Sequence, residues 1–296
     1  MTIAKRILKI NKVFERVEKY PDFITYPRQL KGYTWYKPLL TIILAGILTS
    51  VFTMILVIVV SGGSTSAMAM LNGGYDGLNT YSFRGLVSLA CTGMLVPATL
   101  IAARLVGGRP ISSYLHSRES WNWKLFIYPL IITVLVLIIP SIYLIYTHKL
   151  TFDNHFTIVT LLLTLILAPL QTCGEELLYR GVIMQTLGSW FKIPILAIII
   201  QSLLFVVIHP YNLIGMVDIL FYALFYGIVS WKTKGLEASM AMHTANNTFL
   251  FILLGVGLNF FGKDTSMEIF LLNAIFTGII TVIVLFLNKK YNWSEN

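Results

Sequence analysis

Residues 171–181 read Gln-Thr-Cys-Gly-Glu-Glu-Leu-Leu-Tyr-Arg-Gly and stand between two apolar runs, at 158–167 and 193–208. A charged side chain inside a bilayer costs about 2.5–3.5 kcal/mol on insertion scales, so three charges at this place require a reason. On a helix, Glu176 and Arg180 are four residues apart and share a face, where they can neutralise each other. Glu175 points about 100° away from that face and is free of the arginine. The stretch indicates either a charge cluster at a membrane boundary or a polar site inside a bundle.

The composition excludes a soluble domain. Of the 296 residues, 56% are hydrophobic and 12% are charged, and the mean hydropathy is +0.77, which is typical of a protein with several membrane spans. The net charge of +9 does not indicate nucleic-acid binding, because the basic residues lie mostly outside the apolar runs. Cys91 and Cys173 are far apart and predict neither a disulfide framework nor a metal motif. No cleavable signal peptide is expected, since the first apolar run begins near Pro38 and is too long.

The apolar runs predict an all-α fold, a polytopic membrane bundle of about eight transmembrane helices. We place the spans near 38–60, 84–106, 124–146, 155–173, 192–209, 212–231, 236–257 and 267–287. Residues 38–287 form this bundle, 288–296 a cytoplasmic tail and 1–37 a basic N-terminal segment in the cytoplasm. Within 1–19, apolar residues recur at helical spacing among lysines and arginines, which is typical of an amphipathic helix on an anionic leaflet. A basic tail with no defined pose is the alternative.

Lysines and arginines alternate between the connections along the chain. The loop 61–82 contains none, whereas the next connection is marked by Arg104, Arg109, Arg118 and Lys124. By the positive-inside rule, this alternation places both termini in the cytoplasm of a multi-pass protein of the cell membrane. Arg84, on the outer side, is the main exception.

Two further pairs of polar or aromatic residues lie where lipid would be expected. Phe205 and His209 end the fifth span, and His243 and Asn247 lie inside the seventh. Each pair is four residues apart and shares a helix face. A single intramembrane histidine is more often a packed helix-contact residue than a catalyst. Two histidines, two glutamates, an arginine and an asparagine on three helices of one bundle, however, supply the base, acid and donors that hydrolysis requires.

These spacings resemble the three motifs of the CPBP family: Glu-Glu-x-x-x-Arg at 175–180, Phe-x-x-x-His at 205–209 and His-x-x-x-Asn at 243–247. That family comprises the type II CAAX prenyl endopeptidases and the bacterial bacteriocin-processing and immunity proteins. The resemblance indicates a protease-like core at 155–257. The first three spans and the last one match the family only in being transmembrane.

The resemblance implies catalytic roles for both glutamates of the first motif. Glu175 would be the general base that activates water, helped by His209. Glu176 and Arg180 would hold the site in shape. The residues alone agree in part, because Arg180 can keep Glu176 ionised while Glu175 lacks that partner.

The resemblance also implies that His243 and Asn247 stabilise the oxyanion, and an amide N–H suits this role. A metal is an open alternative, since Glu175, His209 and His243 would make a zinc set with one position left for water. These residues come from separate helices, and the His-Glu-x-x-His spacing of many zinc proteases is absent. We favour a site without a cofactor, because the side chains suffice, and keep zinc as the alternative.

The function expected from these observations is that of an intramembrane endopeptidase. Its substrates would be membrane-associated peptides or protein tails, either of the CAAX type or peptide precursors, and its other partner is the lipid bilayer. The oligomeric state is not predicted. Rival interpretations are a non-catalytic scaffold, a bacteriocin self-immunity or regulatory partner of the same family, and a transporter. A transporter would be expected to show repeated or broken helices in corresponding halves, which the sequence lacks.

The predicted spans place the site residues at different depths in the membrane. Glu175 falls near the cytoplasmic end of the fourth span, whereas His209 falls near the outer end of the fifth, too far apart to cooperate. We therefore expect the fourth helix to continue well past Glu175, through Met184 or beyond, with a kink at Pro169.

The topology can be tested by cysteine labelling of Asn72→Cys and Asn292→Cys in intact cells. An impermeant reagent applied from outside is expected to label position 72 and not position 292, because the charge alternation places both termini in the cytoplasm. Labelling of position 292 but not 72 would contradict the topology.

Overall fold

A computed structural model describes residues 22–63, 79–209, 211–258 and 265–295. Over these ranges the protein is built from helices, apart from one isolated bridge between His116 and Gly235, so the predicted all-α class is confirmed. The expected amphipathic helix within 1–19 lies outside the described residues. Position 72 of the labelling experiment lies outside them too.

The helices correspond to the eight predicted spans. The spanning elements are α2 (Lys37–Ser61), α4 (Phe83–Gly93) with α5 (Leu95–Val106), α7 (Trp123–Thr147), α8 (Ile158–Glu176), α10 (Pro194–Val207), α11 (Leu213–Lys232), α12 (Glu237–Gly255) and α13 (Met267–Tyr291). Between α8 and α10 lie a π-helix, η2 (Leu177–Met184), and α9 (Gln185–Phe191); the short elements are η1 (Tyr26–Gln29) and α6 (Ser112–Leu115). Six of the described helices are long and apolar enough to cross a membrane. Of the other two, α10 has only 14 residues, and α12 carries the polar residues of the third motif.

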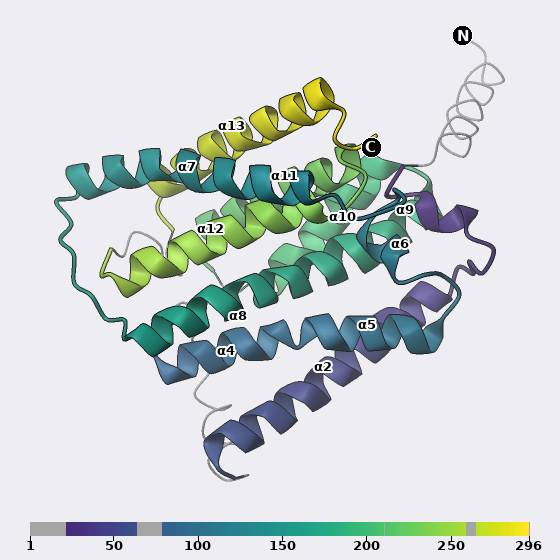
Figure 1. Cartoon of the computed structure of the whole chain (residues 1–296), viewed down its shortest axis with the longest axis horizontal. Helices are drawn as coiled ribbons and strands as arrows, with labels where there is room; N and C mark the ends of the chain where they lie inside the picture. Colours follow the sequence, from purple (N-terminus) through teal and green to yellow (C-terminus); the bar gives the residue numbers. More distant parts are fainter. Residues whose placement is uncertain (1–21, 64–78, 210, 259–264, 296) are drawn as a thin grey trace.

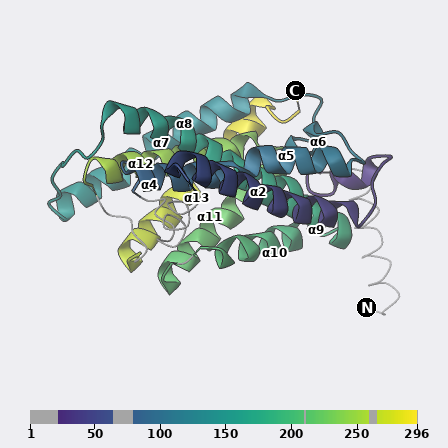
Figure 2. The same ribbon diagram turned by 90° about the horizontal axis from the view of Figure 1, so that it is seen from below.

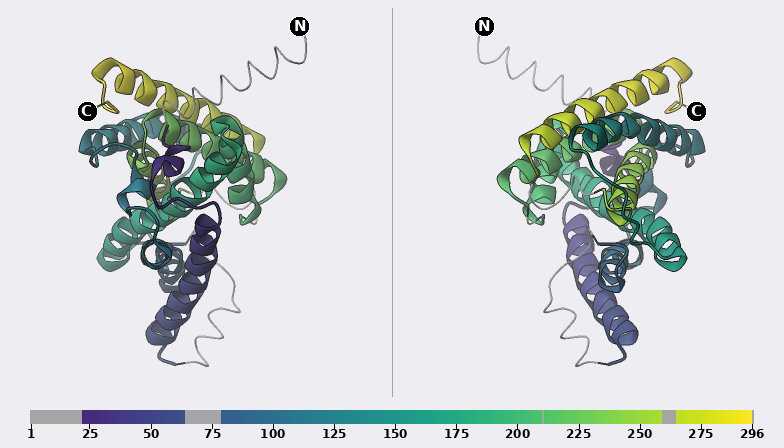
Figure 3. Two further views of the ribbon diagram at one scale, coloured as in Figure 1. Left: turned by 90° about the vertical axis from the view of Figure 1, so that its right-hand side faces the viewer. Right: turned by 90° about the vertical axis from the view of Figure 1, so that its left-hand side faces the viewer.

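Helices α8 and α12 pack against each other in the middle of the bundle (Figure 1). On one side α4 and α5 cover α8, and α2 packs on α5 at the edge; on the other side α7 and α13 lie together. Helix α10 runs beside α11 (Figure 2). Helix α2 projects from the edge of the bundle (Figure 3), and most of its large apolar side chains are exposed. Such a helix is stable only in lipid, so the protein is an integral membrane protein that crosses the bilayer several times.

One continuous helix from Ile158 to Phe191 carries the carboxylates, because η2 and α9 extend α8 without a break. Its 34 residues span about 50 Å, which exceeds the hydrocarbon thickness of about 30 Å. The expectation that the fourth helix continues past Glu175 is confirmed. Glu175 lies 17 residues from Ile158 and 16 from Phe191, at the midpoint of the helix.

A tight turn after Phe191 brings Glu175 and His209 to a similar depth in the membrane. Lys192 ends the long helix in the left-handed conformation with φ of 58°, and Pro194 starts α10 in its first turn. Helix α10 runs back along α9 and η2. Phe191 is about 24 Å along the helix from Glu175, and Pro194 is about 22 Å from His209. Both site residues therefore lie at a similar depth below this turn.

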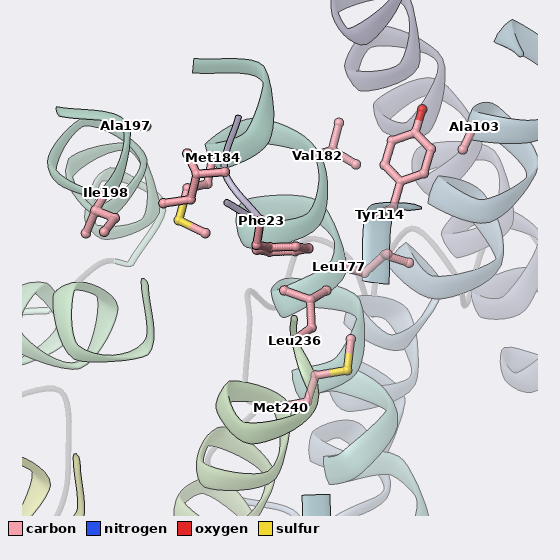
Figure 4. Close-up of a cluster of buried hydrophobic side chains, with 11 residues drawn as sticks. Phe23, Ala103, Tyr114, Leu177, Val182, Met184, Ala197, Ile198, Leu236 and Met240 are labelled. Atoms are coloured by element: carbon pink, nitrogen blue, oxygen red, sulfur yellow. The ribbon is translucent and has the colours of Figure 1, made fainter. Parts of the chain in front are cut away.

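A buried apolar cluster packs around η2 and α9 (Figure 4). Phe23 and Ile24, which precede η1, are fully buried in it, together with Val182, Met184 and Leu236. Ile24 can approach because residue 188 is glycine: a Cβ there would lie 2.7 Å from the Ile24 carbonyl oxygen. The N-terminal segment thus covers one end of the helix that carries the carboxylates.

The start of α12 is held by a buried ion pair. The Arg118 guanidinium contacts the Glu237 carboxylate and the Thr233 carbonyl oxygen, and the Asn122 backbone N–H donates to Glu237 at 3.0 Å. Residue 235 lies opposite His116 and is glycine, because a Cβ there would come within 2.9 Å of the His116 Cβ. The loop before α7 therefore fixes the end of α12 nearest to His243.

We predict that Arg118→Leu lowers the free energy of unfolding by about 3–5 kcal/mol, because it leaves the buried Glu237 carboxylate without its cation. The matched control is Lys234→Ala at the same turn, where Lys234 pairs with Glu295 at 2.7 Å on the surface. Loss of an exposed pair is expected to cost only about 0–1 kcal/mol. Reversible unfolding in mixed micelles of dodecyl maltoside and SDS measures both values. Equal losses would contradict the structural role of Arg118.

Candidate active site

The two glutamates lie where α8 passes into η2, and both are buried. Glu176 is fully buried and forms the predicted ion pair with Arg180, with a distance of 3.0 Å between Oε1 and Nη1. Arg180 is fully buried as well and donates from Nη2 to the Ala223 carbonyl oxygen of α11 at 3.3 Å. Its guanidinium lies 4.8 Å from the centre of the Phe205 ring, a cation–π contact. The charge of Glu176 is thus compensated inside the bundle.

His243 of α12 lies between the two carboxylates. Its Nδ1 is 2.9 Å from Glu176 Oε1, and its Nε2 is 3.6 Å from Glu175 Oε2. Glu175 points away from Arg180, as the spacing predicts, and His243 is the imidazole beside it. Side chains of two packed helices therefore form one row, in the order Arg180, Glu176, His243 and Glu175. Because a carboxylate can only accept, a hydrogen bond to Glu176 requires Nδ1 to carry a proton, which leaves Nε2 to face Glu175.

His209 lies just beyond the end of α10, which ends at Val207. It is therefore not on the helix face shared with Phe205, as the spacing predicted, but its ring folds back and lies 4.6 Å from the Phe205 ring centre. Its Nδ1 is 2.7 Å from the Phe205 carbonyl oxygen and donates to it, which leaves Nε2 for another partner. The Phe205 ring also lies 6.3 Å from the His243 ring. The Phe205 ring therefore lies next to the imidazole rings of both His209 and His243.

Asn247 lies one turn after His243 and contacts α8. Its Nδ2 donates to the side-chain oxygen of Gln171 at 3.3 Å, and Asn246 donates to its Oδ1 at 3.2 Å. One turn nearer to His243, the hydroxyls of Thr172 and Thr244 are 2.8 Å apart. Helices α8 and α12 therefore meet through three polar contacts in succession, made by His243, Thr244 and Asn247 of α12. The amide of Asn247 retains one N–H for another acceptor.

Sequence reasoning missed several residues of the site. Gln171 and Tyr179 lie four residues before and after Glu175, so helical spacing alone could have indicated them. Tyr179 packs its ring against Phe205 at 4.9 Å, and both Tyr179 and Tyr211 are close enough to Glu175 to interact with its charge. The π-helix that follows Glu176 has no signal in the residue pattern.

The proposed zinc ligands do not meet as a set. Glu175 and His243 are adjacent, but within the described ranges no three His, Cys, Asp or Glu side chains converge as metal ligands. As arranged, the residues do not fit a three-ligand zinc site. The chemistry considered below is therefore built from the side chains alone.

The chain is similar to known proteins over this part. Residues 154–249 match the model of the family described as "Type II CAAX prenyl endopeptidase Rce1-like". This range contains all the site residues named so far. The chain is also 27% identical over 184 residues to the uncharacterized protein YyaK of Bacillus subtilis (strain 168), over 58% of this chain and 62% of that protein.

No solved structure matches the chain. The match spans less than two thirds of that relative's length. The match nevertheless covers the residues that carry the three motifs: residues 154–249 are similar to the Rce1-like type II CAAX prenyl endopeptidase family, the family that the motifs indicate.

Proposed function

We propose that this protein is an intramembrane endopeptidase of the CAAX type, in which Glu175 activates water for attack on a peptide bond. The observation that carries this proposal is the position of His243 between two buried carboxylates, one of which is compensated by Arg180. A packing role requires neither a second carboxylate beside the imidazole nor the burial of both.

Each side chain has a defined task in this reaction. Glu175 accepts a proton from water as the water oxygen attacks the carbonyl carbon of the substrate, and His209 holds the same water from the side of Phe205. The negative charge on the carbonyl oxygen is stabilised by the free amide N–H of Asn247 and by an Nε2–H of His243, which in the proposed reaction holds a proton on each ring nitrogen while Glu176 fixes its orientation. When the carbon–nitrogen bond breaks, Glu175 returns the proton to the leaving amine.

The depth of the site supports a proposal for the substrate class. The carboxylates lie midway along a helix that crosses the bilayer, and α10 ends at the same level. A peptide reaches this level only when part of it lies within the membrane. We therefore propose membrane-associated peptides or protein tails, either prenylated CAAX tails or peptide precursors, as substrates.

We predict that Glu175→Gln and His209→Ala each abolish cleavage of such peptides by purified protein while the variants remain inserted and folded, because each removes a group that activates water. Glu176→Gln is expected to lower the amount of folded protein as well, since it strands the buried Arg180. Asp218→Asn is the matched control. Asp218 is also a buried carboxylate in the bundle, but it pairs with Asn273 at 2.8 Å.

Near-normal cleavage by Glu175→Gln or His209→Ala would contradict the assigned roles. A wild-type protein that cleaves no candidate peptide would instead favour a scaffold or an immunity protein built on the same bundle.

We further propose that the reaction proceeds without a metal ion, with zinc as the alternative. Asn247→Ala is then expected to lower kcat by about 10²–10³, the scale for the loss of one oxyanion donor, with no change in metal content. Chelation is expected to leave wild-type activity intact. If zinc were held by the site, Asn247→Ala would weaken metal affinity by about 10–100-fold instead, and added zinc would restore chelated enzyme. Metal analysis beside the kinetics distinguishes the two mechanisms.

A further inference from the structure

The π-helix η2 begins directly after Glu176 and contains Arg180. A π turn places one more residue in each turn than an α-helix, and such segments are rare, weakly held and frequent at functional sites. Backbone hydrogen bonds change register where a π turn meets an α-helix, so donors from outside the helix add to those that hold it. The residues that supply these donors therefore decide whether η2 keeps its geometry.

Arg109 supplies one such donor to η2 from outside the helix, and a second donor to the residue that follows η2. It lies in the loop between α5 and α6, where its Nη2 donates to the Gly181 carbonyl oxygen at 3.3 Å and its Nη1 donates to the side-chain oxygen of Gln185. Gly181 is inside η2, and Gln185 is the first residue after it. The guanidinium is held against the Tyr114 ring, 3.4 Å from its centre. Burial lowers the pKa of Arg109, and the nearby Tyr114 opposes this shift.

Two further close contacts join the end of η2 to α6, the short helix that follows the Arg109 loop. Gln185 is fully buried, and its Nε2 donates to the Ser113 carbonyl oxygen at 3.1 Å, so both ends of its amide are used. A Cβ on Gly181 would lie 2.7 Å from the Tyr114 carbonyl oxygen, so glycine allows α6 to approach the π turn this closely. Arg109 thus joins two points of the long helix that lie one turn apart.

We propose that Arg109 is a positioning residue that holds η2 in its π geometry and thereby sets the directions of the carboxylates and of Arg180 toward His243. Arg180 precedes Gly181 directly, and it reaches back to Glu176. Loss of the Arg109 contacts would remove a donor from the Gly181 carbonyl oxygen and from the side-chain oxygen of Gln185, which favours a different backbone arrangement. Any shift at Gly181 moves Arg180 and therefore the row of charges.

The role of Arg109 in catalysis rests on the proposed peptidase activity and is tested first by kinetics. Arg109→Leu is expected to lower kcat by about 10²-fold with KM unchanged, the scale for a catalytic group displaced by about 1 Å. Arg109→Lys, which keeps the charge but can reach only one acceptor, is expected to retain an intermediate kcat. Arg104→Leu is the matched control, because Arg104 is exposed in the last turn of α5.

Hydrogen exchange followed by mass spectrometry gives a readout that does not depend on activity. Arg109→Leu is expected to increase exchange in the segment 177–187 alone, and Arg104→Leu is expected to leave it unchanged. If exchange rises throughout the protein, the variant is unfolded, and Arg109→Lys decides: wild-type kcat in that variant would overturn the proposal. Unchanged exchange in a folded Arg109→Leu, or increased exchange with wild-type kcat, would also overturn it. If wild-type protein cleaves no peptide, the peptidase assignment fails, while exchange still decides whether Arg109 holds η2.

Discussion

The structure depends on the compensation of one buried negative charge. Glu176 is fully buried in the bundle, and a buried carboxylate is stable only with a cation and a hydrogen-bond donor in place. Arg180 of the same helix supplies the cation, and His243 of α12 supplies the hydrogen-bond donor. The two helices must therefore stay in register, and the threonine and amide contacts between them keep that register. The His243 imidazole that donates to Glu176 therefore also lies beside Glu175. One arrangement thus both stabilises the bundle and forms the site.

The backbone is adapted to this requirement at both ends of the site. The helix that carries the carboxylates continues far beyond them, and its partner α10 ends halfway so that His209 reaches their level. The π turn adjusts the direction of side chains after Glu176, at the cost of weaker backbone bonding that the loop at Arg109 offsets. Residues distant in sequence, from the N-terminal segment to the loop before α7, are packed around this helix.

Much of the fold and of the site follows from simple patterns in the sequence. Apolar runs predict the eight helices, and spacing of four residues pairs Glu176 with Arg180. The continuation of the fourth helix past Glu175 follows from the need to bring Glu175 and His209 to one depth. The position of His243 between the carboxylates does not follow, because it depends on the register of two helices distant in sequence. The end of α10 before His209 and the π turn also cannot be predicted from the sequence, because each is set by tertiary packing rather than by local preference.

The length of the helix from Ile158 to Phe191 has a consequence for selectivity. It is longer than the bilayer is thick, so tilt or local deformation of the lipid must accommodate the excess, and its packed partners fix how far each end protrudes. The carboxylates at its midpoint are then held at a set distance from the membrane surface. In the proposed peptidase reaction, the bond cleaved would be the one that lies at this depth, whatever residues flank it. Membrane thickness and the length of a substrate's anchor would then govern the choice of cleavage position.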